Sequence, residues 1–266
     1  MTEPIPPPSP TAPTSKEALN NSIAKAITIL NAFSHEQPQL RLKEISALTG
    51  INQATAYRML NTLKEYNLIA QQKGLYALGR GFLKYEAIVL HSMEIRNLAL
   101  PFLIELSNHL KANVNLAILD GREVVYVARA ETPYCVYGYF HIGMRRPAHC
   151  TALGKVLLCQ TPELVSEIFK NGVIRYTLNT ITDEAVFAAE LEKARLQGYA
   201  LDAEEWNNGI NCIAAPVYDL GRKIIAGVSI SGPTSTYPLP KILEYIPVLI
   251  DYTHRISGRL GVNNGW

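Results

Sequence analysis

The sequence predicts a two-domain α+β protein. A small helical domain that ends in a β-hairpin is followed by a larger domain in which helices cover an antiparallel sheet. The chain has 266 residues, which exceeds the usual length of one domain. Its basic surplus is confined to residues 18–80, and strands rich in β-branched residues begin only after residue 110. With 48% hydrophobic and 18% charged residues, the chain can bury a substantial core.

A proline-rich lead precedes the first domain. Residues 1–17 contain six of the 16 prolines and show no core-forming pattern, so we expect them to be disordered. From Ser22 to about Phe33, apolar residues recur with the spacing of a helix. We expect Ser22 or Asn21 to cap this helix. Its predicted inward face consists of Ile23, Ala26, Ile27, Leu30 and Phe33.

Two further helices follow around a glycine. A short helix from Leu42 to Leu48 is expected to end at Gly50, because glycine readily takes the left-handed conformation that reverses the chain. Asn52 can cap a third helix that runs to about Tyr66. The predicted inward residues are Leu42, Ile45 and Leu48 in the second helix and Ala56, Leu60 and Leu63 in the third. Two short helices joined by a tight turn are typical of a helix-turn-helix.

A predicted hairpin completes the first domain. Residues 68–72 and 75–78 have strand patterns on either side of Lys73-Gly74, so residues 18–80 have the order of a winged helix-turn-helix. This segment carries seven Lys and Arg against three acids, a balance of +4, whereas residues 81–266 have a balance of −1. A basic module beside a nearly neutral remainder is typical of a domain that meets phosphates. We therefore expect residues 18–80 to bind DNA.

The remainder divides into a linker helix, residues 81–98, and a second domain, residues 99–262. The linker begins with an apolar helix from Phe82 to Ser92 that can pack against a second copy. Further helices are expected at 95–110, 152–159, 162–169, 183–197 and 240–260, and strands at 114–119, 123–130, 212–218 and 223–231. The strands pair across turns at Asp120-Gly121 and at residues 219–222, which favours an antiparallel sheet covered by helices, an α+β sensor domain.

Several protein classes are excluded by what the sequence lacks. It has no run of about 18 apolar residues and no secretion signal, so we expect no membrane span and a cytoplasmic location. Its cysteines (Cys135, Cys150, Cys159 and Cys212) are widely spaced. This spacing fits neither a disulfide framework nor a zinc ribbon and suits a reducing compartment. We predict no metal and no cofactor.

Seven segments carry a family resemblance. They are SIAKAITIL at Ser22–Leu30, the helix-turn-helix segment Ile45–Leu63, GMRRPAHCTALGK at Gly143–Lys155, NTIT at Asn179–Thr182, GYALD at Gly198–Asp202, GINCIAAPV at Gly209–Val217 and VSISGP at Val228–Pro233. In this order they resemble the isocitrate lyase regulator (IclR) family of transcription factors, over residues 20–261. The resemblance implies a GAF-like second domain, no enzymatic activity, a homodimer or homotetramer, and a role as repressor or activator, of which we favour repressor.

On the DNA side, the resemblance implies that the third helix enters the major groove of a double-stranded operator. Its leading residues are Gln53, Ala54, Thr55, Tyr57 and Arg58. Arg58 can bond guanine or a phosphate, and Gln53 can pair with adenine. Relatives often carry Lys-Ser-Thr where this chain has Gln53-Ala54-Thr55, a departure that removes one charge and one hydroxyl. Tyr57 can instead pack on a neighbouring helix, and Lys73 in the wing is expected to touch the DNA backbone or minor groove.

On the sensor side, Ser229 and Ser231 lie two residues apart in a predicted strand, so their hydroxyls share one face. The helix start at Thr151–Gly154 can offer backbone N–H groups, which suit an anion. The resemblance places the effector contacts at Ala152, Leu153, Asp202, Cys212, Ser229 and Ser231. We therefore expect a small carboxylate effector, with Asp202 either protonated or bonded to a hydroxyl or keto hydrate of the ligand.

Other interpretations of these residues remain open. The two serines can form a solvated strand face, and Cys212 can be a small buried hydrophobe. The aromatic residues Tyr134, Tyr137, Tyr139 and Phe140 can line the pocket or belong to the core. The pair Arg145-Arg146 can lie on the surface or offset the ligand's charge.

Two other functions also compete with effector binding. Cys150 beside His149, with Asp202 near, can suggest a cysteine-dependent enzyme, but adjacent residues on a strand face opposite sides. A metal-responsive regulator would use His149, Cys150, Asp202 and Cys212, although their spacing matches no zinc pattern.

Overall fold

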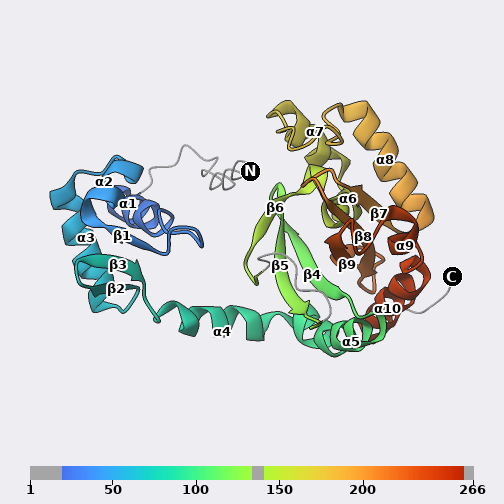
Figure 1. The fold of residues 1–266 in the computed structure, drawn as a ribbon, viewed down its shortest axis with the longest axis horizontal. Coiled ribbons are helices and arrows are strands. Elements are labelled where there is room, and N and C mark those ends of the chain that lie inside the picture. Colours follow the sequence, from blue (N-terminus) through green and yellow to red (C-terminus); the bar gives the residue numbers. More distant parts are fainter. Residues whose placement is uncertain (1–19, 134–140, 261–266) are drawn as a thin grey trace. The chain divides into compact units, whose positions relative to one another are not determined.

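The computed structural model describes residues 20–133 and 141–260 and divides the chain into two compact units (Figure 1). The first unit is Met1–Ser92 and the second is Met93–Trp266. Both combine helices with antiparallel strands, which confirms the predicted α+β class. The division falls inside the segment predicted as a linker. Residues 1–17, predicted as a disordered lead, lie outside the described residues.

The three helices of the first unit begin and end at local capping signals. The predicted cap of α1 (Asn21–Leu30) was wrong, because the side chain of Asn20 accepts the hydrogen bonds from the first backbone N–H groups. α2 (Leu42–Thr49) ends at Gly50, whose φ of 69° is left-handed as predicted. α3 (Gln53–Glu65) begins after Asn52, also as predicted, and the Oδ1 of that residue accepts from a backbone N–H in the first turn at 2.9 Å.

A three-stranded sheet completes this unit, in the order β1-β3-β2. β2 (Ile69–Gln72) and β3 (Leu75–Leu78) form the predicted hairpin. Lys73 and Gly74 join them with φ values of 50° and 78°, which is the left-handed pair that a tight hairpin turn requires. The sequence did not predict β1 (Gln39–Arg41), because three residues are too few to show a strand pattern.

The core of the first unit consists of Ile29, Phe33, Leu40, Ile45, Ile51, Ala56, Leu60, Ile69 and Tyr76. Three residues predicted to face it are exposed instead. Ile23 and Ile27 of α1 are 59% and 51% exposed, and Leu48 of α2 is 59% exposed. The side of α1 that packs on the core is therefore the one that carries Ile29, which was not in the predicted set. Phe33, just beyond the helix, is buried as predicted.

α4 (Phe82–Ser92) closes the first unit, and none of its residues, all of them described, is buried. Four of its large apolar side chains, Leu83, Tyr85, Ile88 and Val89, are more than half exposed. Among the described residues, no single helix is long and apolar enough to cross a membrane. Within these residues, only α4 and the following α5 (Glu94–Leu110), counted together, have the length and apolar composition of a span, and the two helices are bent by 85° at their junction.

The second unit is built on a six-stranded sheet in the order β6-β5-β4-β9-β8-β7, with every neighbouring pair antiparallel. The strands are β4 (Asn113–Asp120), β5 (Glu123–Ala130), β6 (Arg145–Pro147), β7 (Ala200–Ala203), β8 (Ile210–Tyr218) and β9 (Ile224–Pro233). The edge strands β6 and β7 were not predicted because they are only three and four residues long. The four longer strands, β4, β5, β8 and β9, were predicted.

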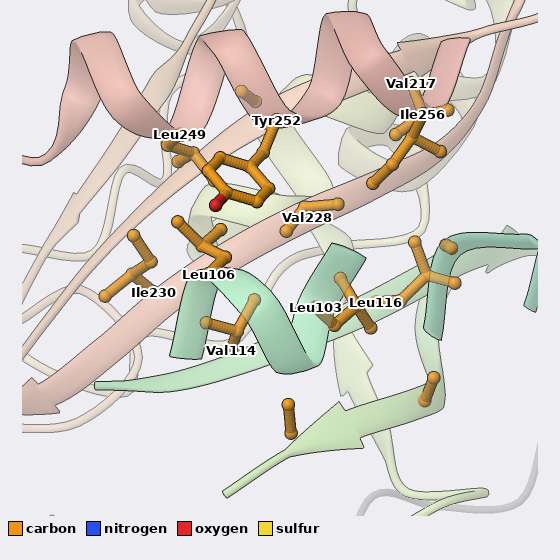
Figure 2. Packing of buried hydrophobic residues seen from close by; sticks show 14 of the residues in the cluster. Leu103, Leu106, Val114, Leu116, Val217, Val228, Ile230, Leu249, Tyr252 and Ile256 are labelled. Carbon is orange, nitrogen blue, oxygen red and sulfur yellow. The ribbon is translucent and has the colours of Figure 1, made fainter. Parts of the chain in front are cut away.

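Helices cover both faces of this sheet (Figure 1). Figure 2 shows one face, where Leu103 and Leu106 of α5 and Leu249 of α10 (Ile246–Arg259) pack on Val228 and its neighbours. The opposite face is covered by α6 (Ala152–Leu158), which in turn packs against α7 (Pro162–Lys170) and α8 (Glu184–Gln197). That second face carries the predicted effector contacts.

Two predictions about the second unit were wrong. The terminal helix, predicted as one, is two, because α9 (Leu239–Leu243) stops before α10 and Pro247 lies in the first turn of α10, where its missing N–H is tolerated. His149 and Cys150 lie in a 3-10 turn rather than on a strand. The strand argument against a Cys-His pair therefore does not apply, and their own contacts must decide.

Candidate effector site and DNA-binding surface

The first turns of α3 present a polar surface. Ala56 and Leu60 are fully buried on the inner side of the helix. Four of the predicted contact residues, Gln53, Ala54, Tyr57 and Arg58, are exposed, and Thr55 is half-buried. Tyr57 is 49% exposed, so about half of its surface is open to a partner and about half is covered by the protein. Lys73 is exposed at the tip of the hairpin.

Four polar residues line up across the sheet on the face under α6. In the strand register Asp202 of β7 pairs with Cys212 of β8, Cys212 pairs with Ser231 of β9, and Ser231 pairs with Asn113 of β4. Directly paired residues on antiparallel strands share a face. The structure therefore brings together three of the predicted contacts, and each of the three is more than nine-tenths buried.

A second row lies one step along the same face. Ala214 of β8 pairs with Ser229 of β9, Ser229 pairs with Asn115 of β4, and Asn115 pairs with Arg129 of β5. Ser229 and Asn115 are each 1% exposed. Among the described residues, neither amide atom of Asn115 has a hydrogen-bond partner, and the Ser229 Oγ has none of good geometry beyond its interaction with the Cys212 thiol. Buried polar groups are rarely left in this state, so the row is a candidate contact for a polar ligand.

The start of α6 covers these rows. A Cβ built on Gly227 of β9 would lie 2.9 Å from the Cδ2 atom of Leu153, so glycine allows the helix to approach the sheet. Thr151 caps the helix by accepting from the N–H of Gly154 at 3.1 Å, and Lys155 makes the first intrahelical bond. The N–H groups of Ala152 and Leu153 precede that bond, which leaves them as first-turn donors. Both residues are buried.

Asp202 is the group whose acidity is most affected. Burial, reinforced by the charge of Glu205, raises its pKa to about 7, although backbone N–H groups of Glu205 and Trp206 donate to its Oδ1 at 2.7 and 3.4 Å. Glu205 itself forms a buried ion pair with Lys155 of α6, whose ammonium also donates to the carbonyl oxygen of Leu201 at 2.8 Å. Through these two contacts Lys155 connects α6 to β7 and to the segment that follows it.

The two cysteines near the candidate site, Cys150 and Cys212, show no sign of activation. Burial and the charge of Asp202 raise the pKa of both the Cys150 and the Cys212 thiols, which suppresses the thiolate needed for a nucleophile or a metal ligand. His149 Nε2 lies 3.0 Å from the carbonyl oxygen of Ile174 rather than on a thiol. No group of three or more His, Cys, Asp or Glu among residues 20–133 and 141–260 is arranged to hold a metal ion. The metal-responsive alternative thus gains no support.

The two adjacent arginines have different surroundings. Arg145 pairs with Glu123 at 2.6 Å and with Asp120 at 2.9 Å. The guanidinium carbon of Arg146 lies 4.8 Å from the centre of the Trp206 ring, and Trp206 is one of the two residues whose backbone N–H groups donate to Asp202. Arg145 therefore belongs to ion pairs at the sheet edge, whereas Arg146 brings positive charge close to the candidate site.

Sequence reasoning missed Asn115 and the Lys155–Glu205 pair. The alternation Asn113-Val-Asn115 places two polar residues on one strand face, the same signal that singled out the two serines. The ion pair joins residues 50 positions apart, which no local pattern reveals. The aromatic group Tyr134, Tyr137, Tyr139 and Phe140 lies outside the described residues.

A winged helix-turn-helix joined to an antiparallel α+β domain defines a two-domain transcriptional regulator. The family model of the IclR helix-turn-helix domain matches residues 22–73, and that of the bacterial transcriptional regulator IclR C-terminal domain matches residues 87–258. The chain belongs to the IclR family. Its members are transcriptional regulators rather than enzymes, so the cysteine-dependent enzyme is excluded.

Relatives and solved structures agree with this assignment. The regulator XynR of Escherichia coli is 35% identical over 218 residues, covering 80% of this chain and 86% of XynR. The regulator KdgR of the same organism is 32% identical over 248 residues, covering 92% and 94%. The crystal structure of IclR from Thermotoga maritima has a TM-score of 0.74 at 32% identity, covering 91% of this chain and 99% of that one.

Proposed function

We propose that this protein is a repressor whose operator binding is controlled by a small organic acid bound between the sheet and the start of α6. One observation carries the proposal. On a sheet face whose other residues are mostly apolar, Asp202, Cys212, Ser229 and Ser231 gather as a buried polar group. The related repressor AllR of Salmonella typhi is 31% identical over 257 residues, which supports the repressor role.

The chemistry of the group suits a carboxylate. The hydroxyls of Ser229 and Ser231 and the first-turn N–H groups of Ala152 and Leu153 can donate to its two oxygens. Asp202, with a pKa of about 7, can stay protonated beside that anion, and Arg146 adds positive charge. An IclR homologue from Microbacterium hydrocarbonoxydans, 22% identical to this chain, is complexed with the carboxylate 4-hydroxybenzoate, which is consistent with a ligand of this class.

The DNA side follows from the exposed surface of the first unit. Gln53, Ala54, Thr55, Tyr57 and Arg58 would read base edges in the major groove, and Lys73 would contact the DNA backbone. Paired half-sites are the rule for helix-turn-helix proteins. We therefore propose a homodimer, or a homotetramer built from it, acting on an operator with two-fold symmetry in the cytoplasm.

The test combines a ligand screen with a double variant. A thermal-shift screen of small carboxylates on the wild-type protein should find acids that raise the melting temperature and release operator DNA in a gel shift. Ser229→Ala with Ser231→Ala should bind the operator normally and ignore those acids. Ser107→Ala is the control, because this buried serine belongs to α5, on the opposite face of the sheet, and donates to the carbonyl oxygen of Ala112. A double variant that still responds would place the effector elsewhere.

A further inference from the structure

Asn115 is a buried polar side chain that the proposed carboxylate contacts do not use. It lies in the middle of β4 and is 1% exposed. Among the described residues, both its Nδ2 and its Oδ1 atoms lack a hydrogen-bond partner. An amide side chain has two donor hydrogens and two acceptor positions, and burying it without partners is costly. An amide held in this state inside a well-ordered sheet suggests that a ligand supplies the missing bonds.

The strand register fixes where such a ligand would lie. Asn115 is paired directly with Ser229 on one side and with Arg129 on the other. Arg129 is held by Glu131 at 2.7 Å. Paired residues on one face are about 5 Å apart, so a carboxylate held by the two serines would leave Asn115 about one or two carbon atoms further along the ligand. Asn115 and Ser229 both lie on the face that α6 covers.

We propose that Asn115 is a specificity-determining residue that recognises a second polar group on the effector, a hydroxyl or carbonyl on the carbon next to the carboxylate or on the one after it. This inference rests on the proposed function, because it needs the carboxylate at Ser229 and Ser231. It narrows the effector class from carboxylates in general to hydroxy acids and oxo acids. An amide suits both, because its Nδ2 donates to a carbonyl and its Oδ1 accepts from a hydroxyl.

The stability of the empty protein gives a first test. Asn115→Leu removes a buried amide without partners and keeps a side chain of similar size, so the melting temperature of the empty protein should rise. Asn211→Leu is the matched control. Asn211 is also a buried asparagine on a strand, but its Nδ2 donates to the carbonyl oxygen of Tyr237 at 2.9 Å, so this variant should lower the melting temperature. A fall with Asn115→Leu as large as that with Asn211→Leu would overturn the inference.

Ligand discrimination gives the decisive test. The probes are pairs of acids that differ by one oxygen, such as lactate or pyruvate against propionate and 3-hydroxybutyrate against butyrate, with gluconate as a longer hydroxy acid. The wild-type protein should bind the oxygenated member of at least one pair about ten- to a hundredfold more tightly. Asn115→Leu should bind both members nearly equally while Asn211→Leu keeps the preference. Asn115→Ala serves as a second variant if leucine prevents folding.

The possible results separate the two proposals. If simple carboxylates bind but the wild type and Asn115→Leu discriminate equally, the role of Asn115 is wrong and the effector site stands. If no acid of the panel binds the wild type, and the wider screen of carboxylates also finds none, the effector site falls and this inference with it. Loss of the preference in Asn115→Leu alone supports both.

Discussion

Protonation of Asp202 should control how tightly the effector binds. Its pKa of about 7, raised by burial and by the charge of Glu205, means that the side chain gains its charge near neutral pH. A bound carboxylate would lie beside this group, and two adjacent carboxylates repel unless one holds a proton. The effector should therefore bind the protonated form of Asp202, and Asp202→Asn should mimic that form at every pH.

The size of the effect follows from the pKa. Between about pH 6 and about pH 8 the protonated fraction of a group with this pKa falls from roughly nine-tenths to roughly one-tenth, so the affinity should fall about tenfold. Glu205 also has a pKa raised by burial, although its ion pair with Lys155 opposes this shift, so Asp202→Asn is the variant that separates the two carboxyls. The neighbouring thiols, hydroxyl and imidazole do not produce this slope. Burial keeps the Cys150 and Cys212 thiols and the Tyr126 hydroxyl protonated, and His149, whose pKa is lowered by burial, stays neutral.

Asp202 should also make the stability of the ligand-free protein depend on pH, and the direction of that dependence follows from its raised pKa. Because the folded pKa lies above the ordinary value of 3.8, the folded state holds more protons than the unfolded state between about pH 4 and about pH 7. Stability should therefore fall as the pH rises through this window and level off above it. Asp202→Asn should show a smaller fall, because only the contribution of Glu205, whose pKa is also raised by burial, then remains. Melting curves across the window measure the difference.

Calorimetry is the appropriate binding assay, with an acid from the screen as ligand and two buffers of different ionisation enthalpy. The wild-type protein should take up about half a proton for each ligand bound near pH 7 and close to one near pH 8, and Asp202→Asn should take up none. An affinity of the wild type that does not change between about pH 6 and about pH 8 would refute the reasoning. So would a tenfold fall that persists in Asp202→Asn.

Three further predictions concern DNA binding, association and folding. Arg58→Ala should weaken operator binding about ten- to a hundredfold in a gel shift, whereas Lys64→Ala, at the far end of α3, should not; equal losses would contradict our view of which end of α3 reads the DNA. Ile88→Asp, on the exposed apolar side of α4, should shift the light-scattering mass toward one chain from at least two for the wild type, and a single-chain mass for the wild type would disprove the dimer. Gly154→Ala should destabilise the protein by about 3 kcal/mol in denaturant unfolding, because its Cβ would lie 2.0 Å from the carbonyl oxygen of Ala148. Gly221→Ala, whose Cβ would meet only the Asp219 Oδ1 atom at 3.3 Å, should cost little, and equal effects of the two variants would show that the Ala148 contact yields.

Where structure depends on neighbours in the chain, the sequence predicts it well. Gly50 and Asn52 mark the end of α2 and the start of α3 because turns and caps are made by the residues themselves. The same holds for Lys73-Gly74, which forces the hairpin. The prediction that Ile23 and Ile27 face the core fails. The spacing of apolar residues in α1 allows either of two neighbouring sides of the helix to be buried, and only packing against α2 and α3 selects one of them.

The candidate site shows the same limit. Strand alternation places Ser229 and Ser231 on one face, and that much is visible in the sequence. Asn115 becomes their neighbour only when β4 pairs with β9, a contact between segments more than 100 residues apart. The role of each predicted contact in binding remains a prediction, and the experiments above test it.

The exposure of α4 has a consequence for how the protein assembles. A helix of 11 residues is marginal in water without tertiary contacts, and no residue of α4 is buried in the single chain. In the proposed dimer, folding of this helix and association of two chains would then be one event, and dilution would unwind α4. In a separated chain, α4 would be unfolded. Two recognition helices would be held at a fixed spacing only in the proposed dimer.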